Sequence, residues 1–347
     1  MSTKTLLATA LADAHGLVAE GLSPRRLRRL FPSPLPVFGV FPGRGLVSDD
    51  TEHAAITAQA FIVSGGEAHA FERELARRLK RWLWALPPAT GLATGQALLK
   101  LSVGVSPKKS GAKSAGNGPC MRAPVLGALV SQPGALYDLV NRSSRMTHKD
   151  LEAIHGAFLV ARWVSLAKAL KRAPDALELK AAVAPWVHSR EVWLPLLDEI
   201  HSSVARSQTT AEFLQSKGWM RGPTGYVVHT VAAVLHCLQS TPGTWEEVVR
   251  SAVRLGGDTD SVAALVGALA VHDPQRGPLP EAWLSRLRDW PMTRQWLERL
   301  GTQAQSVSQS RAPASPPELP FFSRVARNMG FLVLVLGHGI RRLFPPY

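Results

Sequence analysis

Apolar residues recur at steps of three and four positions along most of the chain, a spacing that predicts amphipathic helices. Between residues 67 and 86, for example, Phe71, Leu75, Leu79 and Trp82 follow this spacing among charged neighbours. Proline and glycine separate further stretches of the same kind, at residues 6–20, 52–62, 149–171, 189–203, 226–239, 245–255 and 261–271. No stretch shows the convincing two-residue alternation of a strand, so we predict an all-α protein.

The C-terminal end departs from this pattern in two segments. Residues 301–320 are rich in Ser, Gln, Ala and Pro, a composition that buries too little apolar area to order itself and that we interpret as a linker. Residues 321–347 are basic and apolar, but their uninterrupted apolar run, 329–337, is much shorter than the roughly 20 residues that span a bilayer. We expect this tail to dock on the body; the alternatives are a partner or an anionic membrane surface near Arg324, Arg327, Arg341 and Arg342.

The composition indicates a sizeable hydrophobic core and an excess of positive charge. Of the 347 residues, 46% are hydrophobic, which is enough for a sizeable core. Lys and Arg number 40 against 26 Asp and Glu, so the net charge is +14. Such a charge attracts anionic ligands such as nucleotides, or simply solvates the surface. Nucleic acid is the less favoured ligand, because the arginines of residues 25–29 lack aromatic stacking platforms and a recognisable reading module.

The two cysteines, Cys120 and Cys237, are far apart and have no CxxC or Cys/His spacing, which argues against a disulfide framework and against a zinc site. The first twenty residues are interrupted by Asp13, His15 and Glu20, so they lack the apolar stretch of a secretion signal. A reducing cytoplasm is therefore the expected location, and we expect a monomer.

Two acidic clusters stand directly before predicted helices. The first, residues 48–52 (Ser-Asp-Asp-Thr-Glu), places Asp49 and Glu52 in a capping-box spacing, so a helix N-cap explains it when it is taken alone. The second, residues 257–261 (Gly-Asp-Thr-Asp-Ser), permits the same explanation. Taken together, the clusters also offer carboxylates and hydroxyls from two helix N-termini, the oxygen ligands that Mg²⁺ prefers. Adjacent carboxylates repel and persist where a cation, a cap or solvent compensates them.

Residues 113–122 (Lys-Ser-Ala-Gly-Asn-Gly-Pro-Cys-Met-Arg) form a glycine-rich loop. Glycines let backbone amides approach an anion closely, but the Asn117-Gly118 pair is also a common turn dipeptide. The Gly-Lys-Ser/Thr ending of an ATP-binding P-loop is missing. Taken alone, the loop is either a plain turn or a cradle for a phosphate.

The first half of the chain resembles the ADP-ribosylglycohydrolase family. Residues 12–20 (Ala-Asp-Ala-His-Gly-Leu-Val-Ala-Glu) are similar to the family's Gly-Asp-Ala-Leu-Gly-x-x-x-Glu opening, with Ala12 and His15 as departures. Residues 48–51 (Ser-Asp-Asp-Thr) resemble its Thr-Asp-Asp-Thr metal motif, with Ser48 in place of threonine.

Later segments continue the resemblance in the family's order. Residues 114–122 are similar to the Ser-x-Gly-Asn-Gly-x-x-Met-Arg loop, and residues 147–148 look like the short Thr-His signature that follows. Residues 256–263 (Gly-Gly-Asp-Thr-Asp-Ser-Val-Ala) resemble Gly-Gly-Asp-Thr-Asp-Thr-x-Ala, with Ser261 in place of threonine; a serine hydroxyl offers the same donor and acceptor sites. The resemblance implies that residues 1–300 are the catalytic domain, a single compact orthogonal helical bundle.

The resemblance further implies a hydrolase that removes ADP-ribose from a modified protein or small conjugate by cleaving the glycosidic bond at the distal ribose. It implies two Mg²⁺ ions, with Mn²⁺ as an alternative, held by Ser48, Asp49, Asp50, Asp258, Asp260 and Ser261. Catalysis would involve Asp49 and Asp50 together with Glu20, which stands at the family's substrate-side carboxylate, whereas Asp13 is expected to be structural. Substrate binding would fall to Gly116, Asn117, Gly118 and His148.

The main alternative is a non-catalytic member that binds ADP-ribose or a partner protein on the same scaffold. Retention of all four metal aspartates argues against a dead site. No residue identifies the acceptor, which is arginine, serine, a nucleic-acid base or a small molecule. Reversal of a regulatory modification and immunity against a toxin would use the same chemistry.

Overall fold

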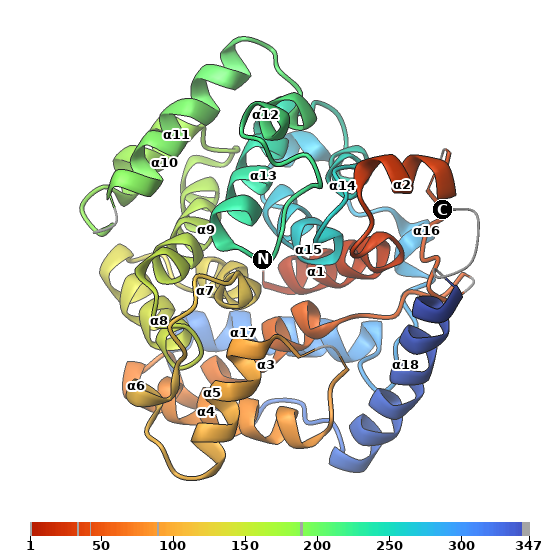
Figure 1. Ribbon diagram of the computed structural model, residues 1–347. Helices are drawn as coiled ribbons and strands as arrows, with labels where there is room; N and C mark the ends of the chain where they lie inside the picture. Colours follow the sequence, from red (N-terminus) through yellow and green to blue (C-terminus); the bar gives the residue numbers. More distant parts are fainter. Residues whose placement is uncertain (1, 33–34, 42, 89, 188–189, 342–347) are drawn as a thin grey trace.

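The computed structural model describes residues 2–32, 35–41, 43–88, 90–187 and 190–341 and is shown in Figure 1. Helices follow one another through short loops, and the described residues contain isolated β-bridges but no β-strand. The prediction of an all-α protein is therefore confirmed. In chain order the helices are α1 (Ser2–Gly16), α2 (Pro24–Leu30), α3 (Asp49–Ser64), α4 (Ala68–Trp84), α5 (Leu92–Ser102), α6 (Pro107–Ser110), α7 (Ala123–Leu129), α8 (Pro133–Arg145), α9 (Leu151–Leu170), α10 (Ala176–Val183), α11 (Arg190–Ala205), α12 (Thr210–Ser216), α13 (Val227–Ser240), α14 (Trp245–Arg254), α15 (Thr259–Ala270), α16 (Glu281–Leu284), α17 (Arg294–Ser310) and α18 (Phe321–Arg341).

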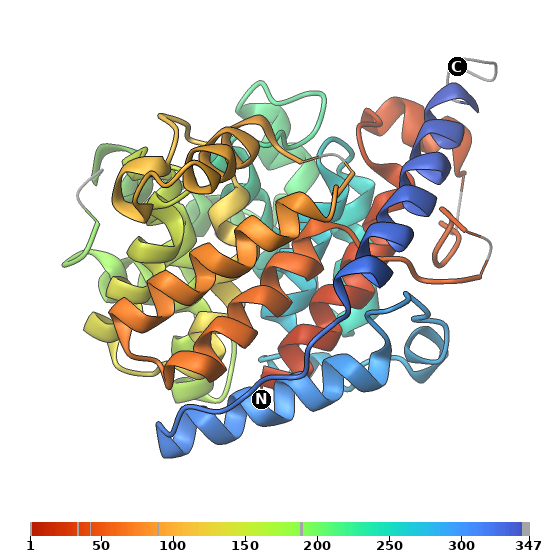
Figure 2. The ribbon, with the colours of Figure 1, turned by 90° about the horizontal axis from the view of Figure 1, so that it is seen from below.

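Helix α1 lies in the middle of the molecule (Figures 1 and 2), and every residue from Thr5 to Gly16 is buried. A helix that is covered on all sides is a core helix, and α1 packs against α3, α7, α15 and α17. Small residues permit the contact with α15, because a Cβ added to Gly267 would lie 2.5 Å from the Cβ of Ala12. The first helix of the chain is therefore held by helices that come much later.

The end of α1 meets the start of α15. A Cβ on Gly16 would lie 2.5 Å from the carbonyl oxygen of Thr259 and 2.6 Å from the Cα of Asp260, so only glycine fits there. The hydroxyl of Thr259 donates to the carbonyl of Gly16 at 2.9 Å. This contact holds the first turn of α15 against the segment that leads to Glu20.

Helix α1 also holds the start of α3. Asp13 accepts hydrogen bonds from the backbone amides of Ser48, at 2.9 Å, and Thr51, at 3.2 Å, and from the Thr51 hydroxyl. Amides at a helix N-terminus have no partner within the helix, so Asp13 supplies one. This is the structural role expected for Asp13.

The expected linker boundary at residue 300 is wrong, because α17 continues to Ser310. Leu300, Ala304 and Val307 are buried and extend the apolar face of this helix at steps of four and three. A buried face of this spacing stabilises a helix even where the remaining positions are Ser and Gln.

Only residues 311–320 of the expected linker are non-helical, and they are attached to α3. The amide of Ala314 donates to the carbonyl of Ile62 at 3.0 Å, and the side-chain amide of Gln59 donates to the carbonyl of Pro317 at 2.7 Å. Composition alone predicted a segment that cannot order itself, whereas these bonds fix it to the surface of the body.

Helix α18 docks on the body, as expected for the tail. Asn328 is fully buried and its side-chain amide donates to the carbonyl of Ala85 at 2.8 Å, while Phe331 is buried beside it. Figure 2 shows α18 along one edge of the molecule. Residues 342–347 of the expected tail lie outside the described residues.

One helix of the described chain, α9, is long and apolar enough to cross a membrane by length and composition. Other helices bury 72% of its most apolar window. Core helices pass the same test, and the burial of α9 is that of a core helix.

Candidate active site

The two acidic clusters come together at the N-termini of α3 and α15. The hydroxyl of Ser261 donates to Oδ2 of Asp50 at 3.0 Å, and the hydroxyl of Ser48 lies 3.5 Å from the same oxygen. Asp50 and Asp260 are buried. Residues from opposite ends of the chain thus share one polar locus in the core.

Helix capping accounts for only part of these clusters. Ser48 is the N-cap of α3, and its hydroxyl accepts from the amide of Asp50 at 3.2 Å. The expected capping box of Asp49 and Glu52 is wrong, because Glu52 instead accepts a hydrogen bond from the indole of Trp82. At α15, Asp258 occupies the N-cap position without a side-chain cap bond. Capping therefore does not explain Asp49 or Asp258.

A glycine turn places the segment of Glu20 beside the second cluster. Gly257 has a φ of +75°, and a Cβ there would lie 2.0 Å from the carbonyl oxygen of Pro223, so the position requires glycine. The Gly257 amide donates to the carbonyl of Leu22, and its carbonyl accepts from the amide of Gly21, both at 2.8 Å. These two bonds lie directly after Glu20 in the chain.

The glycine-rich loop is anchored to the second cluster through Asn117. Its side-chain amide donates to Oδ2 of Asp258 at 2.8 Å and to the hydroxyl of Thr230 at 3.0 Å. Its backbone amide donates to the carbonyl of Gly225 at 2.8 Å. The loop therefore lies beside the carboxylates, as the resemblance implied.

His148 supports this loop from within. A Cβ on Gly116 or Gly118 would come within 3.0 Å or 2.9 Å of its ring, so both glycines make room for the imidazole. His148 is buried, with Nδ1 3.0 Å from the hydroxyl of Thr147. Burial, followed by the positive charge of Arg122, lowers the pKa of His148 to about 3. The ring is therefore neutral at pH 7, and its contact with substrate stays a prediction.

The carboxylates raise one another's pKa values. For Asp49, Asp50 and Asp260 the pKa is well above the usual range, first because of burial and then because of neighbouring negative charges. The charges acting on Asp260 include those of Glu20 and Asp258. The negative charges that raise these three pKa values include Glu20, Asp49, Asp50 and Asp258, so residues of both clusters lie close together. Excess negative charge of this kind favours a bound cation.

The donor set fits a hard cation such as Mg²⁺. One carboxylate oxygen of Asp50 and one of Asp13 are buried without a hydrogen-bond partner, which is costly unless something positive satisfies them. The hydroxyls of Ser48 and Ser261 add neutral oxygen ligands. Among the described residues, no group of three acidic, histidine or cysteine side chains is already gathered to hold a metal. Binding of a cation by these residues would therefore require side-chain rotation, such as release of the Ser261 hydroxyl from Asp50.

Helix α18 closes one side of the cavity at the acidic clusters. The clusters and the segment before them contribute Glu20, Ser48, Asp49 and Asp260 to its lining, and α18 contributes Arg327, Phe331 and Val335. The tail is thus part of the wall of the candidate site, a role that the sequence analysis did not assign to it.

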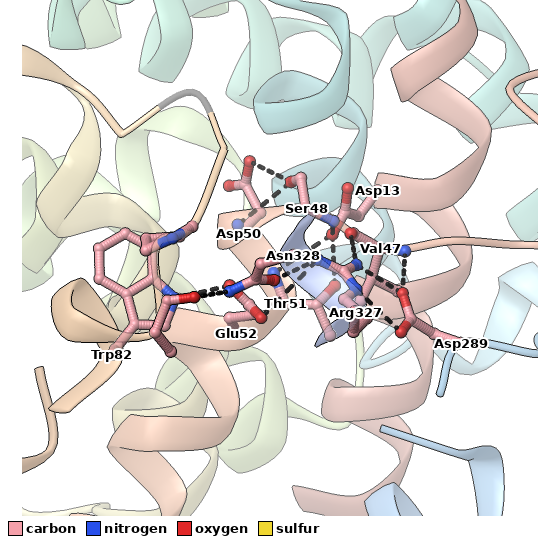
Figure 3. A network of polar contacts seen from close by, with 12 residues as sticks. Asp13, Val47, Ser48, Asp50, Thr51, Glu52, Trp82, Asp289, Arg327 and Asn328 are labelled. Atoms are coloured by element: carbon pink, nitrogen blue, oxygen red, sulfur yellow. Dashed lines mark hydrogen bonds and ion pairs between the residues drawn. The ribbon is translucent and has the colours of Figure 1, made fainter. Parts of the chain in front are cut away.

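Arg327 is the site residue that sequence reasoning missed most clearly. Its guanidinium pairs with Asp289 at 2.6 Å, donates to the carbonyl of Val47 and lies 3.9 Å from Glu52 (Figure 3). Asp289 is 1% exposed, so the pair is buried. The sequence shows Arg324, Arg327 and Arg341 in a largely apolar segment. Nothing in that pattern distinguishes Arg327 from the other two, because its partners are distant in the sequence.

Arg122, at the end of the glycine-rich motif, holds that motif in place. It is fully buried and donates to the hydroxyls of Ser143 and Thr147, both at 2.9 Å. Its Nη1 also lies 3.1 Å from Nδ1 of His53 on α3. Arg122 therefore links the loop, the Thr-His pair and α3.

The acidic clusters, the loop and the Thr-His pair surround one locus, and the sequence pattern of the ADP-ribosylglycohydrolase family matches residues 2–314. The chain belongs to this family. Membership in the ADP-ribosylglycohydrolases supports a hydrolase of ADP-ribosyl linkages. Helix α18 lies beyond the matched residues, although it lines the same cavity.

Two relatives support this assignment. An uncharacterized protein of Archaeoglobus fulgidus is 29% identical over 313 residues, which cover 86% of this chain and 93% of that protein. A solved structure of an ADP-ribosylglycohydrolase-related protein complex shares 27% identity with a TM-score of 0.63, over 88% of this chain and 97% of the solved chain. The all-α ADP-ribosylglycohydrolase fold is thereby confirmed.

Proposed function

We propose that this chain is a Mg²⁺-dependent ADP-ribosylglycohydrolase that releases ADP-ribose from a modified protein or small conjugate. The observation that carries the proposal is the convergence of the two acidic clusters, where Ser261 of one bonds to Asp50 of the other. Asn117 attaches the glycine-rich loop to the same place. A cation site beside an anion-binding loop suits a substrate that offers both ribose hydroxyls and a diphosphate.

The residues proposed to hold two Mg²⁺ ions, or Mn²⁺, are those of the two clusters: Ser48, Asp49, Asp50, Asp258, Asp260 and Ser261. When bound, such ions supply Lewis acidity and orient ribose hydroxyls. The buried, unpartnered oxygen of Asp50 supports this assignment.

The protein's own side chains would divide the remaining tasks. In hydrolysis the water oxygen bonds to the anomeric carbon while the bond to the acceptor nitrogen or oxygen breaks, through a state with oxocarbenium character. Asp49 or Asp50 takes one proton of the attacking water and passes it to the leaving nitrogen or oxygen, so the carboxylate returns to its starting state. Glu20, exposed where the cavity begins, orients the 2″-hydroxyl.

The glycine-rich loop would contact the diphosphate through a narrower set of groups than its composition suggests. The Asn117 amide already bonds to Gly225, and the Gly116 amide bonds to the Ser114 hydroxyl at 3.2 Å. Among Gly116, Asn117 and Gly118, direct contact from a backbone amide would therefore fall to Gly118. Gly116 mainly leaves room for the imidazole ring of His148, which packs against the loop.

Both cysteines suit a reducing compartment. Cys120 and Cys237 are buried free thiols, and burial raises the pKa of each above its usual range. Such thiols are poor nucleophiles. We propose a cytoplasmic monomer in which neither cysteine takes part in the reaction.

The test is release of ADP-ribose from a panel of defined conjugates, linked through arginine, serine or a base, with Mg²⁺ and with a chelator. Asp258→Ala with Asp260→Ala is expected to abolish release while circular dichroism shows unchanged helix content. Asp198→Ala is the matched control, because this aspartate on α11 pairs with Lys180 on the surface, away from the two clusters. The conjugate that is cleaved identifies the acceptor.

Release that survives both the chelator and the double substitution contradicts the proposal. Calorimetry with ADP-ribose distinguishes the second candidate, a non-catalytic ADP-ribose-binding member. Metal-dependent binding without turnover of any conjugate would favour that candidate.

A further inference from the structure

Helix α18 has two different faces (Figure 2). Its inner face packs on the body through Asn328 and Phe331, and Arg327 pairs with a buried aspartate. Its other face carries exposed apolar residues at alternating steps of four and three, which we call the outer stripe: Phe322, Ala326, Met329, Val333, Leu336 and Ile340. These side chains stay exposed in the described structure, for example 68% for Val333.

Neighbouring segments widen this apolar surface. The loop after α4 contacts α18 through the bond from Asn328 to Ala85, and it exposes Leu86. Trp290, which follows the ion-pair partner of α18, is exposed as well. Tryptophan rings, with an apolar body and a polar edge, favour the boundary between water and acyl chains. The surface is therefore broader than a seam for one helix.

Positive charge lies beside this surface. Helix α2 lies near the C-terminal end of α18 in both views (Figures 1 and 2) and exposes Arg25 and Arg29. Arg286 and Arg288 are exposed in the segment that supplies the ion-pair partner of α18. An apolar surface flanked by arginines is complementary to a surface that is apolar inside and negatively charged at its boundary.

We propose that the outer stripe binds an anionic membrane surface, with α18 lying in the plane of the bilayer. The apolar side chains enter the boundary between headgroups and acyl chains, while the arginines of α2 and of residues 286–288 contact the headgroups. A second copy of the chain is a poorer occupant. Paired helices flank their apolar seam with charged positions, and residues 328–340 contain no Asp, Glu, Lys or Arg.

The test uses the full chain with vesicles of phosphatidylcholine alone or with about 30% phosphatidylglycerol. Co-sedimentation is expected with the anionic vesicles only, and it weakens at high salt because headgroup contacts are screened. Leu336→Glu is expected to lower the partition coefficient at least about tenfold. Leu99→Glu is the matched control and leaves it unchanged, because Leu99 lies on α5 and is 55% exposed against 56% for Leu336.

Circular dichroism verifies that each variant is folded. If Leu336→Glu does not fold, Val333→Glu and its control Val103→Glu repeat the comparison at two exposed valines. The proposal is overturned if the wild-type chain ignores anionic vesicles, if it binds neutral vesicles equally well, or if the control loses binding to the same extent. Sedimentation velocity measures whether the chain is a dimer. A dimer that Leu336→Glu dissociates would also overturn the proposal, because a second copy of the chain would then cover the outer stripe.

Discussion

The hydroxyl of Ser261 donates a hydrogen bond of 3.0 Å to Asp50, a residue 211 positions away in the sequence. Each lies in the first turn of its helix, so the bond joins the N-termini of α15 and α3. Helix N-termini repel cations, and carboxylates must outweigh them before a metal binds. The aspartates of the two clusters would supply that excess: Asp49, Asp50, Asp258 and Asp260.

Replacing Ser261 tests the bond directly. Ser261→Ala removes one proposed oxygen ligand and the donor to Asp50, so Mg²⁺ affinity, measured by calorimetry, is expected to fall about tenfold. Ser261→Thr is expected to retain affinity because it keeps the hydroxyl. Ser310→Ala, at an exposed position at the end of α17, serves as the control. Equal affinities for the alanine and threonine variants at 261 would exclude the hydroxyl as a ligand.

Gly16→Ala tests whether helix propensity or packing has the larger effect on stability at this position. Gly16 is helical, so alanine alone would gain about 1 kcal/mol, but its Cβ would lie 2.5 Å from the carbonyl of Thr259. Overpacking against backbone typically costs 1–3 kcal/mol or more, so we expect net destabilisation and weaker Mg²⁺ binding. Gly95→Ala in α5, whose Cβ would meet nothing closer than 3.7 Å, is expected to stabilise. Thermal denaturation of both variants gives the comparison, and a stabilised Gly16→Ala would refute the close contact.

His15→Leu restores the residue typical of the family and is expected to stabilise the fold. His15 is fully buried beside Trp283, and neither ring nitrogen has a hydrogen-bond partner among the described residues. An unsatisfied buried polar group costs about 1–3 kcal/mol. Urea denaturation at pH 7 should show a gain of this order. A loss instead would mean that the imidazole packs better than leucine can.

The same variant changes the response to acid. Burial, and then the charges of Arg250 and Arg254, lower the pKa of His15 to about 3 from 6.5. The unfolded chain therefore binds a proton between pH 6.5 and 3 while the folded chain does not, so His15 makes stability fall as the pH falls through this window. Free energies of unfolding at pH 7 and pH 5 are expected to differ less in His15→Leu, by up to about 2 kcal/mol. If the free energy of unfolding varies with pH in the same way in the wild-type chain and in His15→Leu, His15 does not make stability depend on pH.

Arg327→Gln is expected to loosen α18. It leaves the buried carboxylate of Asp289 without its cation, and breaking a buried pair from one side costs about 3–5 kcal/mol. Hydrogen exchange should show faster exchange along α18. Arg77→Gln, which removes an exposed pair with Glu74, is expected to cost less than about 1 kcal/mol. Unchanged exchange in α18 would show that apolar contacts alone hold it.

Periodicity predicts the helices that have one polar and one apolar face or a long apolar run, such as α4, α9 and α14. It misses α7, all of whose residues are buried and which begins near Pro124, because a helix without a polar face gives no contrast between positions. It also predicts no helix at α17, and composition placed a linker from residue 301, since Ser and Gln at exposed positions conceal the buried Ala304 and Val307. The composition of residues 301–310 is dominated by the exposed face of α17, whereas the buried face stabilises the helix.

The acidic clusters, the loop and Glu20 could be predicted as one site because the family motifs mark them. Arg327 and Arg122 could not be assigned their roles in the same way. Each acts through partners that only the tertiary fold brings near, such as Asp289 and His53. The capping box at Asp49 fails for a related reason, because a buried indole competes for Glu52. Local spacing cannot register such competition.

The central position of α1 has a consequence for how the protein is made. Two of the helices that cover its apolar surface are α15 and α17, so a growing chain carries this helix only partly covered until the last third has been synthesised. At ordinary translation rates that wait lasts on the order of tens of seconds. Contacts between such distant segments also close slowly once the chain is complete. The apolar surface of α1 is therefore exposed to aggregation during synthesis, and a chaperone that binds the nascent chain would be expected to bind there.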